Sequence, residues 1–362
     1  MNVRRAALAL ATAAVLAVLA FALLPRRTQH PDADIQAIGD TLPPPESVNA
    51  EDAFAAVPHA PMRVPGAADD EAFGLVGDVA VSAGRVFVLD VLNHQVSQFG
   101  GDGARTGVLG RKGGGPGEFL GPVALAADEG LLYVLDERRQ GIDQFDVAAG
   151  AWRRTLPLDF HAADVCAVDG RLYVLGARDG YVLHEVSAAD GHVVRSFAPD
   201  SASRDVLLAS YRSGGYLGCS PSGEIAFLPS LRGEVARFDA ASGRLLGTVQ
   251  IPGYRPVRVR PGPNGGVQFD VPGGGSHDYG GAIVPMPGGD WLVQVGRLRR
   301  HSQSQHEFES LRSYRLSAGG TMRRLDEPLP RVMAAADTAA YAVTTSPYPA
   351  VARIAVPWKE SE

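Results

Sequence analysis

The body of the chain is built from short apolar runs that open on a turn residue and recur along the sequence. Six such runs can be aligned, and the first five begin with Gly: GRVFVLD (84–90), GLLYVLD (130–136), GRLYVLG (170–176), GEIAFLP (223–229), GDWLVQV (289–295) and AAYAVTT (339–345). Corresponding residues stand 40 to 66 positions apart. Periods of this size, each with room for several short strands, are typical of propeller blades. Residues 58–362 are therefore predicted to form an all-β fold, a six-bladed β-propeller of four-stranded blades.

A second periodic position lies six residues before the aligned residues Val86, Leu132, Leu172, Ile225, Trp291 and Ala340. It holds mostly small residues: Ala80, Ala126, Cys166, Cys219, Pro285 and Ala334. Small residues are expected where inner strands crowd around an axis. In an exported protein the two cysteines could form a disulfide. Because sixfold geometry should hold equivalent positions farther apart than the roughly 7 Å Cα limit for a bridge, we expect two buried free thiols.

The last blade is short of residues. Only 22 residues follow Ala340, enough for two further strands of a blade. The missing outer strand is predicted to come from the N-terminal side, near residues 61–65, because such a clasp joins the chain ends and removes exposed sheet edges.

The N-terminal segment has the pattern of a membrane-targeting sequence. Arg4 and Arg5 precede an apolar stretch over residues 6–24, which is long enough for a membrane-spanning hydrophobic helix. Residues 1–27 are predicted to be a signal-anchor or signal peptide, with cleavage left open. Residues 28–57 are predicted to be a Pro-containing linker that holds the body outside the membrane, in the periplasm or at the cell surface.

Composition agrees with an exported, strand-rich protein. The chain of 362 residues has 43 Gly and 26 Pro, which favour many tight turns over long helices. Its net charge of −6 gives no overall basic character, so nucleic acid is not an expected partner.

The glycine-rich stretch GRKGGGPGEFLGPVALA (110–126) could be either a phosphate-binding loop or a structural corner. A phosphate-binding loop needs glycines that lead into a helix, usually with Lys followed by Ser or Thr. Here the glycines run into Pro116, and the apolar segment from Pro122 is typical of a strand. The stretch is therefore predicted to be a structural corner.

The sequence VFVLDVLNHQVSQF (86–99), followed by LGRKGGGPGEFLGPVALA, resembles an NHL repeat, whose usual form has an Asn-His pair and then Gly-Arg-x-Gly-x-Gly-Pro-Gly-x-Phe. The resemblance covers the first two blades, and beyond residue 160 only the strand spacing persists. It implies that residues 110–121 cross from one blade to the next. It also implies that Asn93 and His94 form a structural turn, and that Asp90 and Asp136 belong to the scaffold.

Function is expected in the loops. On the face that carries the blade crossings, basic residues slightly outnumber acids, whereas acids outnumber basic residues on the opposite face. A long crossing (252–280) and a long turn (297–307) concentrate arginine and aromatic residues, a combination suited to anionic or flat ligands. We expect a binding or scaffold module, without a cofactor, for an anionic envelope ligand or a protein partner. The predicted ligand-binding residues are Arg255, Arg258, Arg260, Tyr279, Arg297, Arg299 and Arg300.

The alternative is an enzyme. Six-bladed architecture resembles that of metal-dependent lactonases and of amidating or ring-opening lyases, which implies catalytic groups at the central channel. Under this alternative His161, His277 and His306 would bind Zn or Ca, with Asp164 or Tyr279 assisting. The spacing of these residues follows no repeat position, and the sequence has no Gly-x-Ser-x-Gly motif.

Overall fold

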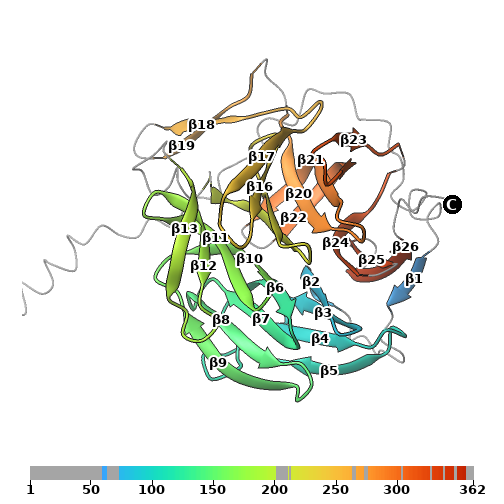
Figure 1. The fold of residues 1–362 in the computed structure, drawn as a ribbon. Coiled ribbons are helices and arrows are strands. Elements are labelled where there is room, and N and C mark those ends of the chain that lie inside the picture. The colour runs from blue at the N-terminus through green and yellow to red at the C-terminus, as the bar shows by residue number, and fades with distance from the viewer. Residues whose placement is uncertain are drawn as a thin grey trace, which may run out of the picture. The chain divides into compact units, whose positions relative to one another are not determined.

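The structure, a computed structural model, confirms the six-bladed β-propeller (Figure 1). It describes residues 59–62, 73–200, 211, 213–262, 266–272, 276–302, 305–326, 328–336, 339–345 and 349–355. Among these residues there are six four-stranded sheets and one two-stranded sheet. In each blade the first strand contacts the first strands of the neighbouring blades, so six inner strands surround the axis.

The blades follow one another along the chain, and their strands have the following bounds. Blade 1 contains β2 (Val76–Ser82), β3 (Arg85–Asp90), β4 (Gln95–Phe99) and β5 (Arg105–Leu109). Blade 2 contains β6 (Pro122–Asp128), β7 (Leu131–Asp136), β8 (Gly141–Asp146) and β9 (Ala151–Pro157). Blade 3 contains β10 (Ala162–Val168), β11 (Arg171–Arg178), β12 (Tyr181–Val186) and β13 (Val193–Pro199). Blade 4 contains β14 (Gly215–Ser220), β15 (Glu224–Pro229), β16 (Glu234–Asp239) and β17 (Leu245–Gln250). Blade 5 contains β20 (Tyr279–Pro285), β21 (Trp291–Ser302), β22 (Gln305–Leu316) and β23 (Met322–Arg324). Blade 6 contains β24 (Arg331–Ala336), β25 (Ala339–Thr344), β26 (Ala350–Ala355) and, as its outer strand, β1 (His59–Met62).

Blade 6 combines strands from both ends of the chain. In Figure 1 β1, in blue, lies beside β26, in dark red. The two strands are antiparallel, with Ala60 opposite Arg353 and Met62 opposite Val351. The predicted clasp by an N-terminal strand is confirmed, a few residues earlier than expected.

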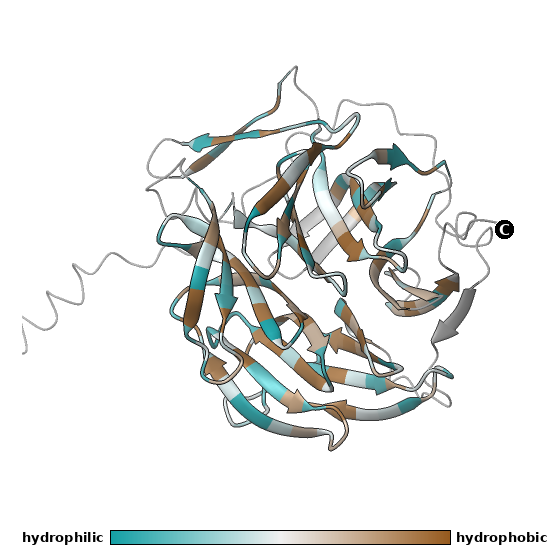
Figure 2. Ribbon diagram, viewed as in Figure 1, coloured by the Kyte–Doolittle hydropathy of each residue, from teal (hydrophilic) through white to brown (hydrophobic). Residues whose placement is uncertain are grey.

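The hydrophobic core is divided among the junctions between blades. Each of six buried clusters draws its residues from two neighbouring blades. Figure 2 shows the hydrophobic residues distributed over the strands of all the blades, with hydrophilic residues interspersed. Most of the stabilisation that comes from burying apolar surface therefore arises from contacts between neighbouring blades.

Residues 110–121 form the crossing from blade 1 to blade 2, as predicted, because β5 ends at Leu109 and β6 begins at Pro122. The crossing folds around the fully buried ring of Phe119. Gly110 has a φ of 78°, and a Cβ there would lie 2.1 Å from the Phe119 ring. Only glycine allows both this backbone conformation and this close approach.

Two buried aspartates hold neighbouring crossings in place. The Asp90 carboxylate accepts hydrogen bonds from the backbone N–H groups of Gly74 and Leu75 and from the Asn93 side chain. At the corresponding site, Asp136 accepts the N–H groups of Leu120 and Gly121. The structural interpretation of these aspartates and of Asn93 is confirmed.

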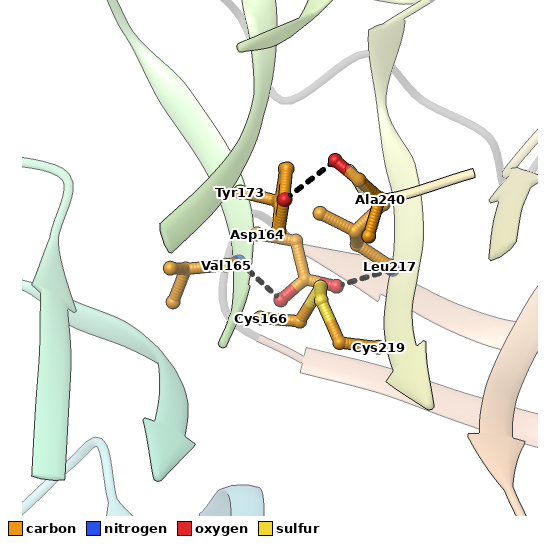
Figure 3. Close-up of a disulfide and its surroundings, with 7 residues drawn as sticks. All are labelled: Asp164, Val165, Cys166, Tyr173, Leu217, Cys219 and Ala240. Atoms are coloured by element: carbon orange, nitrogen blue, oxygen red, sulfur yellow. Dashed lines mark hydrogen bonds between the residues drawn. A yellow bond between two sulfur atoms is a disulfide. The ribbon is translucent and has the colours of Figure 1, made fainter. Parts of the chain in front are cut away.

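Cys166 and Cys219 form a disulfide between β10 and β14, with Cα atoms 5.6 Å apart, so the expectation of free thiols is wrong (Figure 3). Cys166 pairs with Tyr173, whereas Cys219 pairs with Ile225, an aligned residue. The turn after β14 is one residue longer than the turn after β10, so equal sequence spacing does not place the cysteines at equivalent positions. The inner strands are also closer than assumed, since the Asp164 carboxylate on β10 accepts the Leu217 N–H on β14 at 2.7 Å.

The predicted long turn at residues 297–307 is wrong as well. β21 and β22 continue past the blade as a hairpin, in which Arg297 pairs with Ser310 and His301 pairs with His306. Extra pairing between the two strands satisfies the backbone groups of a segment that would otherwise be a long loop.

The predicted membrane segment, residues 6–24, and the linker, residues 28–57, lie outside the described residues. Within the described part of the chain, no helix has the length and apolar character needed to cross a membrane.

Candidate binding surface on the crossing between blades 4 and 5

The crossing from blade 4 to blade 5 runs from Ile251 to Asp278 and contains the hairpin of β18 (Arg258–Pro261) and β19 (Val267–Asp270). Asp278 holds the two ends of the crossing together. The buried Asp278 carboxylate accepts the Arg255 N–H at 2.7 Å and also binds the Arg312 guanidinium from β22. The Asp278 N–H in turn donates to the Arg255 carbonyl at 2.9 Å. The two ends of the crossing are thus tied to each other and to blade 5.

Tyr254 joins the ends of this crossing to blade 4. Its hydroxyl lies 2.8 Å from the Asp278 carbonyl oxygen and 3.2 Å from the Ser230 carbonyl oxygen. Burial raises the pKa of Tyr254 well above its usual value, so the hydroxyl remains a donor. The ring packs on Gly233, where a Cβ would come within 2.5 Å of it.

Four aromatic side chains form a row beside this crossing, one of them, Tyr211, from the segment that precedes blade 4. Tyr279, the first residue of β20, contacts His277 with ring centroids 4.7 Å apart, and His277 stacks on Phe269 of β19 at 6.3 Å. Tyr211 meets Phe269 edge-on at 5.5 Å. Tyr211 and Phe269 are 37% and 36% exposed, so the outer end of the row offers ring surface to a ligand. Burial raises the pKa of Tyr279 to about 12, so its hydroxyl is neutral. We call Tyr211, Phe269, His277 and Tyr279 the aromatic row.

The hairpin geometry places Arg258 and Arg260 on the face away from Phe269. Val259 is directly opposite Phe269, so these two side chains share a face, and Arg258 and Arg260 lie on the other face. Arg260 forms an ion pair with Asp270 there. The Arg255 guanidinium reaches the Ser276 hydroxyl at 3.5 Å, which places it beside the aromatic row.

The remaining contacts of the predicted arginines differ between the crossing and β21. Arg258 and Arg255 are exposed, and neither makes an ion pair with another described residue. Arg297 lies on β21, with its Nε 3.4 Å from the Ser310 hydroxyl of β22. Arg299 and Arg300 are also on β21, but their side chains lie outside the described part of the structure.

His161 and His277 of the enzyme alternative lie at different blade junctions, and His306 lies on β22. His161 is exposed next to β10, with its Nε2 3.1 Å from the Gln140 side-chain nitrogen of blade 2. His277 belongs to the aromatic row, and the His306 side chain is outside the described part. No group of three or more His, Cys, Asp or Glu residues suited to a metal ion occurs within the described part of the chain.

Asp78 is chemically distinctive but was not singled out from the sequence, and Asp164 was named only as an assisting residue of the enzyme alternative. Asp78 and Asp164 interrupt apolar inner strands, and each lies eight residues before an aligned residue, Val86 or Leu172. That shared offset was a usable signal for a paired role. Arg331 and Tyr216 lie on other inner strands, and no spacing in the sequence relates them to these aspartates.

Comparisons with known proteins agree with the fold class defined by the blades. A family model described as a 6-bladed beta-propeller, DUF5128, matches residues 67–190. No curated protein matches the sequence significantly. The match extends over blades 1 to 3, and the protein is a six-bladed β-propeller.

Solved structures with the same fold have very different sequences. A Bacteroides fragilis protein assigned to export is 12% identical, with a TM-score of 0.56 over 86% of this chain and 98% of that protein. Hydrazine synthase of Kuenenia stuttgartiensis is 15% identical, with a TM-score of 0.47 over 77% of this chain and 76% of that one. Virginiamycin B lyase from Staphylococcus aureus is 11% identical, with a TM-score of 0.46 over 78% of this chain and 95% of that one. The similarity to the Bacteroides fragilis protein agrees with the fold and leaves the activity open.

Proposed function

We propose that the protein is an extracytoplasmic binding module, held at the membrane by residues 6–24, whose aromatic row and Arg255 bind an acidic glycan. The observation that carries this proposal is the partly exposed row of four rings with the exposed Arg255 guanidinium beside it, which forms no ion pair with another described residue. No catalytic step is part of the proposal.

The disulfide supports the proposed location outside the cytoplasm. Disulfides persist in oxidising compartments such as the periplasm and are rare in reducing cytosol. The bond between Cys166 and Cys219 joins two inner strands in the interior of the ring, where it supports the fold. Together with the targeting pattern of residues 1–27, it favours export of the body.

The chemistry of the surface supports the ligand class. Exposed aromatic rings such as those of Tyr211 and Phe269 stack on sugar rings or other flat groups. An arginine guanidinium binds a carboxylate in a planar, bidentate way. A chain of sugars with carboxylate groups presents both features at the spacing of successive rings, whereas a lipid head group presents an anion without an extended row of rings.

The proposal is tested with fluorescein-labelled polygalacturonate oligomers and the same oligomers after methyl esterification, which removes their charge. The acidic oligomers should bind, with an affinity that falls as salt is raised, and the esters should bind at least about tenfold more weakly. Arg255→Gln should weaken binding of the acidic oligomers by about tenfold or more, because a hydrogen bond to a charged group contributes roughly 1.5 to 3 kcal/mol. Phe269→Ala should weaken it by about tenfold, because it removes an exposed ring on which a sugar stacks.

Arg258→Gln is the matched control, because it removes the same charge from the same crossing, on the face of the hairpin away from Phe269. Arg323→Gln, on the exposed outer strand β23, is a second control. Both controls should leave binding within about twofold of wild type. Equal binding of the acidic and esterified oligomers, or equal losses for Arg255→Gln and Arg258→Gln, would contradict the proposed site. Binding of acidic peptides in place of the oligomers would identify a protein partner.

A further inference from the structure

A buried ion pair joins the candidate binding surface to blade 5. Asp278 lies where the crossing ends, and Arg312 lies on β22, opposite Val295 of β21. The Asp278 side chain is 2% exposed and that of Arg312 is 20% exposed. The pair is therefore largely shielded from the solvent that reaches the aromatic row.

Asp278 fixes the backbone of Arg255. Its carboxylate accepts the Arg255 N–H at 2.7 Å, and its own N–H donates to the Arg255 carbonyl at 2.9 Å. Its carbonyl accepts the Tyr254 hydroxyl at 2.8 Å. Both polar backbone groups of Arg255 are thus bound by one residue, so the Arg255 guanidinium extends from a fixed Cα.

Arg312 ties the pair to the start of the crossing. One terminal nitrogen of its guanidinium donates to the Asp278 carboxylate, and the other donates to the Gly253 carbonyl at 2.8 Å. A planar guanidinium holds two acceptors in a fixed geometry. Residues at both ends of the crossing are therefore held by one side chain of blade 5.

The same aspartate sets the direction of the inner end of the aromatic row. Asp278 stands between His277 and Tyr279 in the sequence, and the rings of these two neighbours have centroids 4.7 Å apart. Side chains alternate along an extended segment, so the two rings share one side and the Asp278 carboxylate points to the other side. The bonds that hold Asp278 therefore also hold the two rings.

The charge of the pair bears on which ligand can bind. The Asp278 carboxylate is bonded to the backbone of Arg255, the residue proposed to bind a ligand carboxylate. An unpaired charge on Asp278 would repel that ligand and compete for the Arg255 guanidinium, because water screens a buried charge weakly. The Arg312 cation offsets this negative charge, which favours an acidic ligand.

We propose that Asp278 and Arg312 are positioning residues of the acidic-glycan site, and that Arg312 also sets its preference for charged over uncharged sugars. The pair holds Arg255, His277 and Tyr279 in place before a ligand arrives, which lowers the entropy lost on binding. This inference rests on the proposed function, and it assigns a role to two residues that do not touch the ligand.

Binding of the labelled acidic and esterified oligomers to the purified full-length protein tests the inference. Arg312→Gln should weaken binding of the acidic oligomers by about tenfold or more, because it loosens the crossing and leaves the Asp278 charge unpaired. The esters carry no charge, so their binding should weaken by about threefold at most. Without ligand, the Arg255 N–H should exchange with solvent at least about tenfold faster in Arg312→Gln than in wild type.

Arg315→Gln is the matched control for a purely structural effect. It removes an arginine from the same strand and breaks an ion pair with Asp290, which lies in the turn between β20 and β21 and not on the crossing. This variant should lower stability while leaving the binding of both oligomers within about twofold of wild type.

A double variant, Asp278→Asn/Arg312→Gln, removes both charges and leaves an amide oxygen that can accept the Arg255 N–H. It should fold, because no buried charge is left unpaired. It should bind the acidic oligomers at least about threefold more tightly than Arg312→Gln, and about threefold more weakly than Arg315→Gln because the amide pair holds the crossing less firmly.

The outcomes separate this inference from the proposed function. Failure of wild type to bind the acidic oligomers would overturn the proposed function. If wild type binds them, the inference alone is overturned by equal affinities of Arg312→Gln and Arg315→Gln, or by equal losses for acidic and esterified oligomers in Arg312→Gln. If Arg312→Gln does not fold, equal affinities of the double variant and Arg315→Gln would overturn it.

Discussion

The disulfide between Cys166 and Cys219 makes a quantitative prediction about stability. The bond closes a loop, because its cysteines are 53 residues apart in sequence. Loop closure of that length removes chain entropy from the unfolded state and stabilises the fold by about 4 kcal/mol. Replacing both cysteines by serine should lower the free energy of unfolding by about this amount.

Urea unfolding of the body followed by tryptophan fluorescence measures the effect. Oxidised wild type should unfold at a clearly higher urea concentration than wild type in reductant. The double variant Cys166→Ser/Cys219→Ser should match reduced wild type and should not respond to reductant, which controls for effects of the reductant elsewhere.

Two results would refute the reasoning. One is an unfolding midpoint that is the same with and without reductant, since the cross-link would then contribute nothing to stability. The other is a count of two free thiols in the unreduced, denatured protein, since the disulfide would then be missing.

Two further predictions concern the crossings between blades. Asp90→Ala should lower the free energy of unfolding by about 3 kcal/mol, because it leaves buried N–H groups of the crossing without an acceptor. Its control is Asp102→Ala, at an exposed turn aspartate with one hydrogen bond from the backbone, which should lower the free energy of unfolding by less than about 1 kcal/mol. Thermal unfolding of both variants checks this, and equal losses would contradict the structural role of Asp90. Gly110→Ala should destabilise the protein by about 2 kcal/mol or more, because the new Cβ would clash with the Phe119 ring and because the backbone there has a positive φ. Gly114→Ala places no atom near the new Cβ and should be close to neutral. Equal melting temperatures of these two glycine variants would show that the crossing repacks.

The candidate surface was only partly predictable. The long crossing after β17 and its aromatic residues are visible in the sequence because loops of that length stand out from the strand spacing. Which arginines share a face with Phe269 depends on the pairing register of β18 and β19, which local sequence does not specify. Arg255 was therefore grouped with Arg258, although Arg258 lies on the face of the hairpin opposite Phe269 and Arg255 lies before the hairpin, with its guanidinium at Ser276.

The sequence by itself determined the number of blades, the crossing at residues 110–121 and the closure by an N-terminal strand. These features depend on local patterns: alternating apolar runs, glycines at positive φ, and a residue shortage in the last blade. The tertiary structure alone decided the disulfide, the β21–β22 hairpin and the hydrogen bonds by which Asp78 and Asp164 each join two blades. Each of these depends on the distance and register between strands far apart in the chain, and those are set by how the blades pack around the ring.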